Sequence, residues 1–122
     1  MDLKAIADTL VEACRAENET SLLENHYHPD AVSVEAADYS GMGRETKGLD
    51  GIKGKHAWWD ANFEMHSSDV QGPFLHGDDR FAVIFEVDCT EKATGNRMPM
   101  KEVAIYHVAD GKIVREEFFG TG

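Results

Sequence analysis

Basic residues are scarce in this sequence, which has 12 Lys and Arg against 23 Asp and Glu and a formal net charge of −11. Because such a charge repels phosphates, we expect neither a nucleic acid nor an anionic membrane surface as a partner. An apolar run of about 20 residues, the length that a membrane-spanning helix needs, is also absent. The first residues lack the pattern of a signal peptide, and we therefore expect a cytoplasmic protein.

Cysteine is equally rare, and Cys14 and Cys89 are the two examples. Two unclustered cysteines favour reduced core residues over a disulfide or a metal site. The run His-Tyr-His-Pro-Asp at residues 26–30 could suggest metal ligands, but no further histidine follows it closely, and its proline is typical of a turn that leads into a strand. Glycine-rich phosphate loops and nucleophile elbows are missing as well, so we expect no metal and no cofactor.

The first part of the chain contains helical patterns. Apolar residues at helical spacing predict an amphipathic helix over residues 3–16, with Asp2 as its cap. Ser21 and Glu24 have the spacing of a capping box and predict a short second helix that ends at Pro29.

A third helix is predicted from its cap at Asp50 to His66, where a cation would interact well with the helix dipole. Phe63 lies on its apolar side. The adjacent Trp58 and Trp59 cannot point the same way, because successive residues of a helix lie about 100° apart. One tryptophan should face the sheet, and the other should face solvent, a partner subunit or the mouth of a cavity.

Alternating patterns predict the strands. They cover residues 31–36, 67–76, 81–91 and both arms of a hairpin over 99–120, while a glycine-rich loop fills residues 37–48. The hairpin has the clearest signal, because Asp110-Gly111 is a preferred two-residue turn. Strands that follow helices in this order predict one α+β domain over residues 1–122, with the helices on one face of a curved sheet.

The first arm of the hairpin carries polar residues on an apolar face. One side of this strand presents Met100, Glu102, Ala104 and Tyr106. A carboxylate and a phenol in such surroundings form either a satisfied polar pair or the floor of a ligand pocket. In the first case Glu102 accepts a hydrogen bond from Tyr106 or pairs with Arg97 or Arg115, and it merely completes the core.

Three short motifs occur one after another along the chain. They are His28-Pro29-Asp30-Ala31-Val32, Gly48-Leu49-Asp50-Gly51-Ile52 and Asp110-Gly111-Lys112-Ile113-Val114. Together they resemble the nuclear transport factor two-like superfamily, in particular its SnoaL-like branch, over nearly the whole chain. The resemblance implies a cone-shaped roll in which a strongly curved antiparallel sheet with a mixed edge wraps around three N-terminal helices. It also implies an apolar cavity for a small organic ligand and a homodimer.

The resemblance to the ketosteroid isomerases of this superfamily implies roles for two residues. Counting from Asp30, their general base falls on Glu35, and alignment of the hairpins places Tyr106 at their oxyanion donor. Their second donor, a tyrosine in the first helix, corresponds to Val11 here, so the chain departs from the steroid isomerases. The fold itself hosts isomerases, cyclases, dehydratases, epoxide hydrolases and binding modules.

The predicted catalytic residues are Glu35, Glu102, Tyr106 and His66. A carboxylate in an apolar cavity has a raised pKa and can act as acid or base near neutral pH, and a buried phenol can hold an oxyanion. Ligand contacts are expected from Trp58, Trp59, Phe63, Met100 and Ala104. This set predicts cofactor-free isomerase, cyclase or hydrolase chemistry on a small, partly apolar carbonyl or polyketide-like compound. The alternative is a non-catalytic module for ligand binding or dimerisation.

Overall fold

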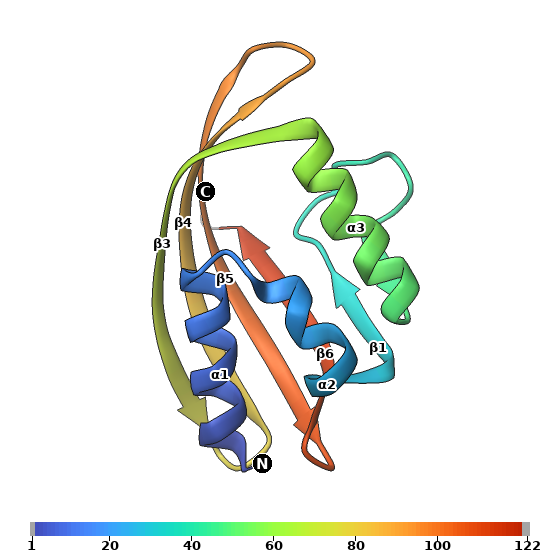
Figure 1. Cartoon of the computed structure of the whole chain (residues 1–122), viewed down its shortest axis with the longest axis vertical. Helices are drawn as coiled ribbons and strands as arrows, with labels where there is room; N and C mark the ends of the chain where they lie inside the picture. Colours follow the sequence, from blue (N-terminus) through green and yellow to red (C-terminus); the bar gives the residue numbers. More distant parts are fainter. Residues whose placement is uncertain (1, 121–122) are drawn as a thin grey trace.

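A computed structural model describes residues 2–120 of the chain (Figure 1). Three helices and six strands follow one another along it, with a short 3-10 helix before the second helix. The helical elements are α1 (Leu3–Arg15), η1 (Glu19–Leu22), α2 (Leu23–His26) and α3 (Leu49–Asn62). The strands are β1 (Tyr27–Val34), β2 (Glu45–Lys47), β3 (Phe63–His76), β4 (Arg80–Glu91), β5 (Arg97–Ala109) and β6 (Lys112–Gly120). The predicted α+β class is confirmed.

All strands belong to one curved sheet with the order β2-β1-β6-β5-β4-β3. The last four strands form an antiparallel meander, whereas β1 pairs with β6 in parallel and with β2 antiparallel. Figure 1 shows the long strands bending around α1, while α3 lies on the same side near β1. The predicted cone of a mixed-edge antiparallel sheet around N-terminal helices is therefore confirmed.

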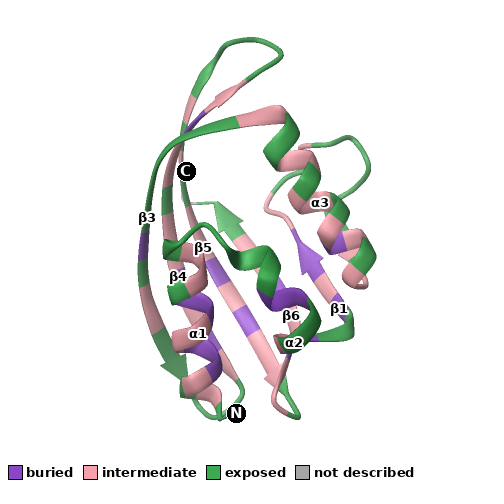
Figure 2. Ribbon diagram, in the orientation of Figure 1, coloured by how far each residue is buried: buried purple, intermediate pink, exposed green. Residues whose placement is uncertain are grey.

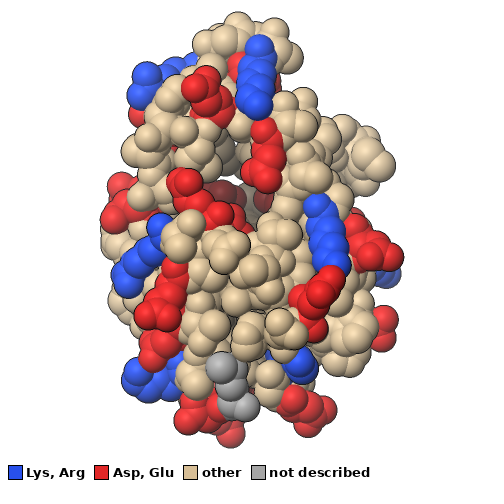
Figure 3. Space-filling model, in the orientation of Figure 1, with Lys and Arg blue, Asp and Glu red and all other residues tan. Residues whose placement is uncertain are grey.

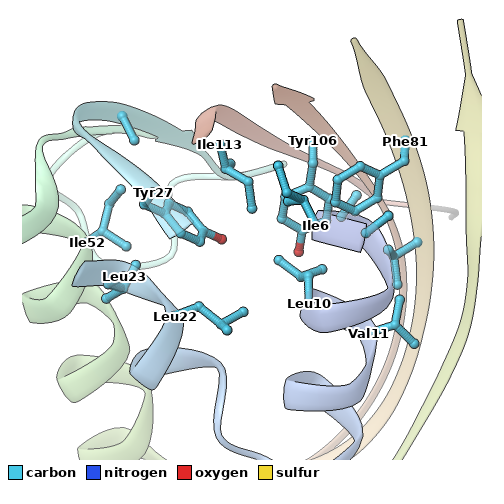
Figure 4. Close-up of a cluster of buried hydrophobic side chains, with 14 of the residues drawn as sticks. Ile6, Leu10, Val11, Leu22, Leu23, Tyr27, Ile52, Phe81, Tyr106 and Ile113 are labelled. Carbon is cyan, nitrogen blue, oxygen red and sulfur yellow. The ribbon is translucent and has the colours of Figure 1, made fainter. Parts of the chain in front are cut away.

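Helix α1 supplies one side of the core. The Asp2 carboxylate accepts a hydrogen bond of 2.8 Å from the backbone N–H of Ala5, which satisfies a donor that the helix itself cannot pair. Its apolar stripe of Ile6, Ala7, Leu10 and Val11 is buried, as the helical spacing predicts. Figures 2 and 4 show this stripe facing the inner residues of the sheet, which include Phe81 and Ile113.

The hairpin of β5 and β6 forms as the sequence predicts. Asp110 and Gly111 both have positive φ angles, of 52° and 74°, which is the geometry of the tight turn that joins twisted antiparallel strands. In the resulting register Tyr106 lies opposite Glu116 and Ala104 lies opposite Phe118. Alternate residues of both strands therefore point into the cone.

The predicted start of the first strand is wrong. Strand β1 begins at Tyr27 and not at residue 31, and Pro29 lies inside it, where the pairing with β6 is interrupted by a register shift. A proline donates no N–H, so an interruption of the ladder is where a strand tolerates it. The capping box does not form either, because the Ser21 hydroxyl donates to the carbonyl of Asn18. The loop over residues 37–48 contains the short strand β2.

The third helix is also shifted from its predicted bounds. Gly48, with φ of 80°, precedes its first residue, and Asp50 lies in the first turn and is not the cap. The helix ends at Asn62, so that Phe63 and His66 belong to β3. The prediction that His66 ends a helix is therefore wrong, because the extended conformation already begins three residues earlier.

Two features of residues 2–120 concern membranes and metal ions. No helix in this range is long and apolar enough to cross a membrane. The same range holds no group of three His, Cys, Asp or Glu side chains placed to bind a metal ion. Cys14 and Cys89 are both free thiols.

Candidate functional site

The concave face of the sheet, α1 and α3 enclose a cavity of about 390 Å³. Figure 3 shows the hollow from one side, with Asp and Glu side chains at its edge and inside it. Its apolar lining comes from Leu10, Trp59, Phe63, Phe85, Val87, Met100 and Phe118. An apolar cavity with a few convergent polar groups is the usual form of a small-molecule site.

A buried ion pair lies in this cavity. Lys55 projects from α3, and its Nζ lies 2.6 Å from Oε1 of Glu35, with both side chains less than 15% exposed, at 12% and 14%. The same ammonium group donates to the hydroxyl of Ser33 and lies 4.8 Å from the centre of the Phe118 ring. Lys55 is three residues after the buried Ile52 and four before Trp59, and this helical spacing directs it inward.

Glu102 is a carboxyl with a strongly raised pKa in the wall of this cavity. Burial, and then the negative charge of Glu35, raise its pKa from 4.5 to about 7, while Lys55 opposes the rise. Its Oε2 is buried without a hydrogen-bond partner among residues 2–120. The predicted alternative of a pair with an arginine does not form, because Arg97 binds Asp88 and Arg115 binds Glu117.

Glu116 is a second buried carboxyl at the cavity wall. It is 3% exposed, and its Oε1 lacks a hydrogen-bond partner within the described part of the chain. Burial raises its pKa, whereas Lys55 and hydrogen bonding with the hydroxyls of Tyr27 and Ser33 lower it. The parallel register of β1 and β6 explains this contact, because Ser33 lies directly opposite Glu116.

Two buried phenols form the deep end of the cavity. Figure 4 shows the hydroxyls of Tyr27 and Tyr106 pointing toward the same space. Burial, and then the charge of Glu116, raise the pKa of both phenols well above the usual value, so both remain hydrogen-bond donors at neutral pH. Tyr106 is held in place by Phe81, whose ring stacks on it at 4.9 Å.

Three of the four predicted catalytic residues, Glu35, Glu102 and Tyr106, line the cavity, and the fourth, His66, does not. Glu35 and Glu102 lie close enough for their charges to interact. Tyr106 lies four residues beyond Glu102 on the same strand, or about 13 Å away at the usual rise per residue. His66 lies outside the cavity lining, on exposed β3, where its Nε2 is 2.6 Å from the hydroxyl of Thr90.

Three of the five predicted ligand-contact residues line the cavity, and two do not. Trp59, Phe63 and Met100 line the cavity. Trp58 does not line it, and its ring packs edge-on against Trp59 and Phe63. Ala104 is fully buried opposite Phe118 in the sheet and is not part of the cavity lining.

Several functional candidates were not predicted from the sequence. The sequence analysis does not identify Lys55, Tyr27 or Tyr39. Strand alternation does predict that one of the glutamates at 116 and 117 points inward, and the structure shows that it is Glu116. Tyr39 packs edge-on against Trp59 at 5.4 Å, and burial, then Glu102 and Glu35, raise its pKa. Helical spacing from Ile52 could have identified Lys55, whereas a tyrosine in a glycine-rich loop gives no comparable signal.

The curved sheet, the helices inside it and the cavity define a cone of the nuclear transport factor two-like type. Residues 1–120 match the model of the SnoaL-like domain, so the chain belongs to this family. A proposed SnoaL-like polyketide cyclase from Mesorhizobium loti is 35% identical, with a TM-score of 0.90 and coverage of 98% of this chain and 99% of that protein. No curated protein matches the chain.

More distant structures share the fold alone. A protein with a cystatin-like fold from Xanthomonas campestris is 17% identical, with a TM-score of 0.77 and coverage of 100% of this chain and 92% of that one. TerC, co-crystallised with polyporic acid, is 21% identical, with a TM-score of 0.67 and coverage of 91% and 85%. These similarities agree with the fold that the resemblance implies.

Proposed function

We propose that this SnoaL-like domain binds a compact, partly apolar carbonyl compound in the cavity and moves a proton on it. The observation that carries the proposal is Glu102, whose carboxyl pKa of about 7 and unpartnered oxygen occur in an apolar wall. Near neutral pH both forms of such a carboxyl are populated, so it can take a proton from carbon and return it. Acid and base groups of the chain itself supply this chemistry.

The proposed step removes a proton from the carbon next to the carbonyl group. Glu102 accepts this proton, and the electron pair moves onto the carbonyl oxygen, which becomes negatively charged. Lys55 and Tyr39 are the donors near Glu102, since Lys55 opposes the rise of the Glu102 pKa, and burial and then the charge of Glu102 raise the pKa of Tyr39. Return of the proton to another carbon gives an isomer, and attack of the enolate on a second carbonyl gives a ring.

Glu35 has a different role in this proposal. Its carboxylate is already engaged at 2.6 Å by Lys55, so it is a weaker candidate for the base than Glu102. We assign it as the positioning residue that holds the ammonium group over Phe118 and toward the substrate. Tyr27 and Tyr106 then bind the far end of the ligand, because the rise of strand β5 separates Tyr106 from Glu102.

Relatives give independent support for a ligand. The protein from Mesorhizobium loti is a proposed polyketide cyclase, and TerC has been co-crystallised with polyporic acid, a small organic molecule. The rival function is a module that binds a ligand without turnover. It uses the same cavity, so the two functions differ only in whether Glu102 moves a proton.

Exchange of protons next to a carbonyl tests the proposal without knowledge of the natural substrate. Beta-tetralone, a bicyclic ketone, would be incubated with the protein in deuterated buffer, and the loss of its proton signals would be followed by NMR. Glu102→Gln should lower the rate by a factor of about 100 to about 10,000, the usual contribution of a general base. Glu64→Gln, which removes an exposed carboxyl outside the cavity lining, should leave it unchanged.

Two results would decide between catalysis and binding. Accelerated exchange that requires Glu102 supports the enzyme. A ketone that raises the melting temperature but exchanges no faster than in buffer supports the rival function.

We also propose that the chain forms a homodimer in the cytoplasm. Phe74 and Phe119 are 52% and 47% exposed on strands of the sheet, and apolar side chains of this size favour burial against a partner. The free thiols of Cys14 and Cys89 agree with a reducing compartment. Light scattering should give twice the chain mass of 13.5 kDa, and a monomer mass would contradict the dimer.

A further inference from the structure

The lining of the cavity has a strong excess of acidic side chains. Six described residues of the lining carry carboxyl groups, whereas Lys55 is the single lysine or arginine among the described lining residues. The acidic residues are Glu17, Glu19, Glu35, Asp60, Glu102 and Glu116. His56 adds little positive charge, because burial and then Lys55 lower its pKa.

The one ammonium group of the lining does not balance these carboxyls. Lys55 is already bound to Glu35 at 2.6 Å and to the hydroxyl of Ser33. Glu116, at 3% exposure, and Glu102 each retain a buried carboxyl oxygen without a hydrogen-bond partner in residues 2–120. A buried polar atom without a partner destabilises the fold, so these two oxygens indicate a donor that is not part of the described chain.

Aromatic rings surround the same space. Trp59, Phe63, Phe85 and Phe118 line the cavity, and Lys55 already shows that a cation is accommodated over Phe118, at 4.8 Å from its ring centre. Ring faces attract cations because their π electrons carry partial negative charge. An ammonium group on an organic body is the chemical class that satisfies the carboxyls and the rings together, whereas an anionic ligand would be repelled.

We infer that the ligand of this cavity carries a positively charged amine, bound at the Glu102 carboxyl beside the aromatic wall, while Glu116 adds negative charge from the deep end of the same cavity. The inference rests on the proposed function in one respect, namely that the cavity takes a small organic ligand. The inference adds that the ligand is positively charged, and the proposed removal of a proton next to a carbonyl group does not require such a charge.

Three probes of nearly the same shape and different charge test the inference. They are the cation para-tert-butylbenzylammonium, whose N–H groups can donate to the carboxyls, the neutral para-tert-butylbenzyl alcohol and the anionic para-tert-butylbenzoate. Calorimetry should show the cation binding to the wild type at least about tenfold more tightly than the neutral alcohol, with the anion weakest. Equal binding of the cation and the alcohol, tighter binding of the anion, or no binding of the cation would each overturn the inference.

Matched variants locate the effect. Glu102→Gln and Glu116→Gln should reduce the preference for the cation several-fold and leave binding of the neutral alcohol unchanged. Glu64→Gln removes the same charge from the exposed start of β3 and should keep the full preference. If Glu116→Gln fails to fold by circular dichroism, Glu102→Gln alone decides, and an unchanged preference in it overturns the inference.

The outcome is separate from that of the exchange experiment. Preference for the cation without proton exchange on beta-tetralone would support the ligand class and contradict the catalytic proposal. Proton exchange on beta-tetralone without any preference for the cation would support the catalytic proposal and contradict the inferred ligand class.

Discussion

Replacing Glu102 with glutamine should make stability less dependent on pH in a defined window. The carboxyl pKa is about 7 in the folded chain, against the ordinary 4.5. Below the lower value the group is protonated in both states, and between the two values only the unfolded chain loses the proton. The folded state then binds more protons, so the free energy of unfolding of the wild type falls as pH rises through this window.

The size of the effect follows from the two pKa values. A pKa difference of about 2.5 corresponds to about 3 kcal/mol of unfolding free energy. Glu102 is half-buried, so screening by solvent makes this an upper value. Glutamine has nearly the same shape and no charge, so the free energy of unfolding of Glu102→Gln lacks this pH dependence. Between pH of about 4.5 and pH above 7, the stability of Glu102→Gln should therefore rise relative to the wild type by up to about 3 kcal/mol.

Urea unfolding followed by tryptophan fluorescence provides the measurement, at several pH values from about 4.5 to about 8.5. Glu64→Gln is the control, because its exposed carboxyl should give a difference from the wild type that changes little with pH. An NMR titration of the Glu102 carboxyl should place its midpoint near 7. If the difference in unfolding free energy between Glu102→Gln and the wild type changes by less than about 0.5 kcal/mol over the whole window, the pKa of Glu102 is not raised and the reasoning fails.

Three further predictions test other parts of the structure. Lys55→Met should lower the free energy of unfolding by about 3 kcal/mol, because it leaves Glu35 buried without its cation, and a double variant with Glu35→Gln should recover most of the loss in urea unfolding. Gly54→Ala should stabilise α3 by up to about 1 kcal/mol in thermal unfolding, since its new methyl group meets open space, whereas Gly51→Ala should gain less because the group would lie 2.9 Å from Cγ2 of Thr46. Trp59→Phe should abolish the fluorescence change caused by a cavity ligand and Trp58→Phe should preserve it; the opposite pattern would contradict the assignment of Trp59 to the lining.

The elements that depend on local pattern could be predicted from the sequence. Helix α1 has both a capping residue, Asp2, and a regular apolar stripe, and its predicted end is within one residue of the observed one. The hairpin has the Asp110-Gly111 turn and a regular alternation, so the inward direction of Glu102 and Tyr106 follows from the period of a strand. The three motifs, through resemblance to the family, added the curved sheet that wraps around the helices.

Other features depend on contacts between distant parts of the chain. The end of α3 is set by the pairing of Phe63 with Glu91 on β4, and nothing in the local sequence opposes continuation of the helix to His66. Whether a lysine on a helix points inward or curves toward solvent depends on what faces it, and Lys55 faces Glu35, twenty residues earlier in the chain. The distance between Glu102 and Tyr106 could have been estimated from the strand rise, which would have separated these two residues before the structure was known.

Glu35→Gln separates the two causes of the raised pKa of Glu102. Burial is the larger cause and the charge of Glu35 the second, while Lys55 acts in the opposite direction. The substitution removes the repulsion and also releases Lys55, so the NMR titration midpoint of Glu102 should fall by at least about 1 pH unit. A midpoint that stays near 7 would mean that burial alone sets it, and that Glu35 neither interacts with the base nor controls the ammonium group that the proposed proton transfer requires.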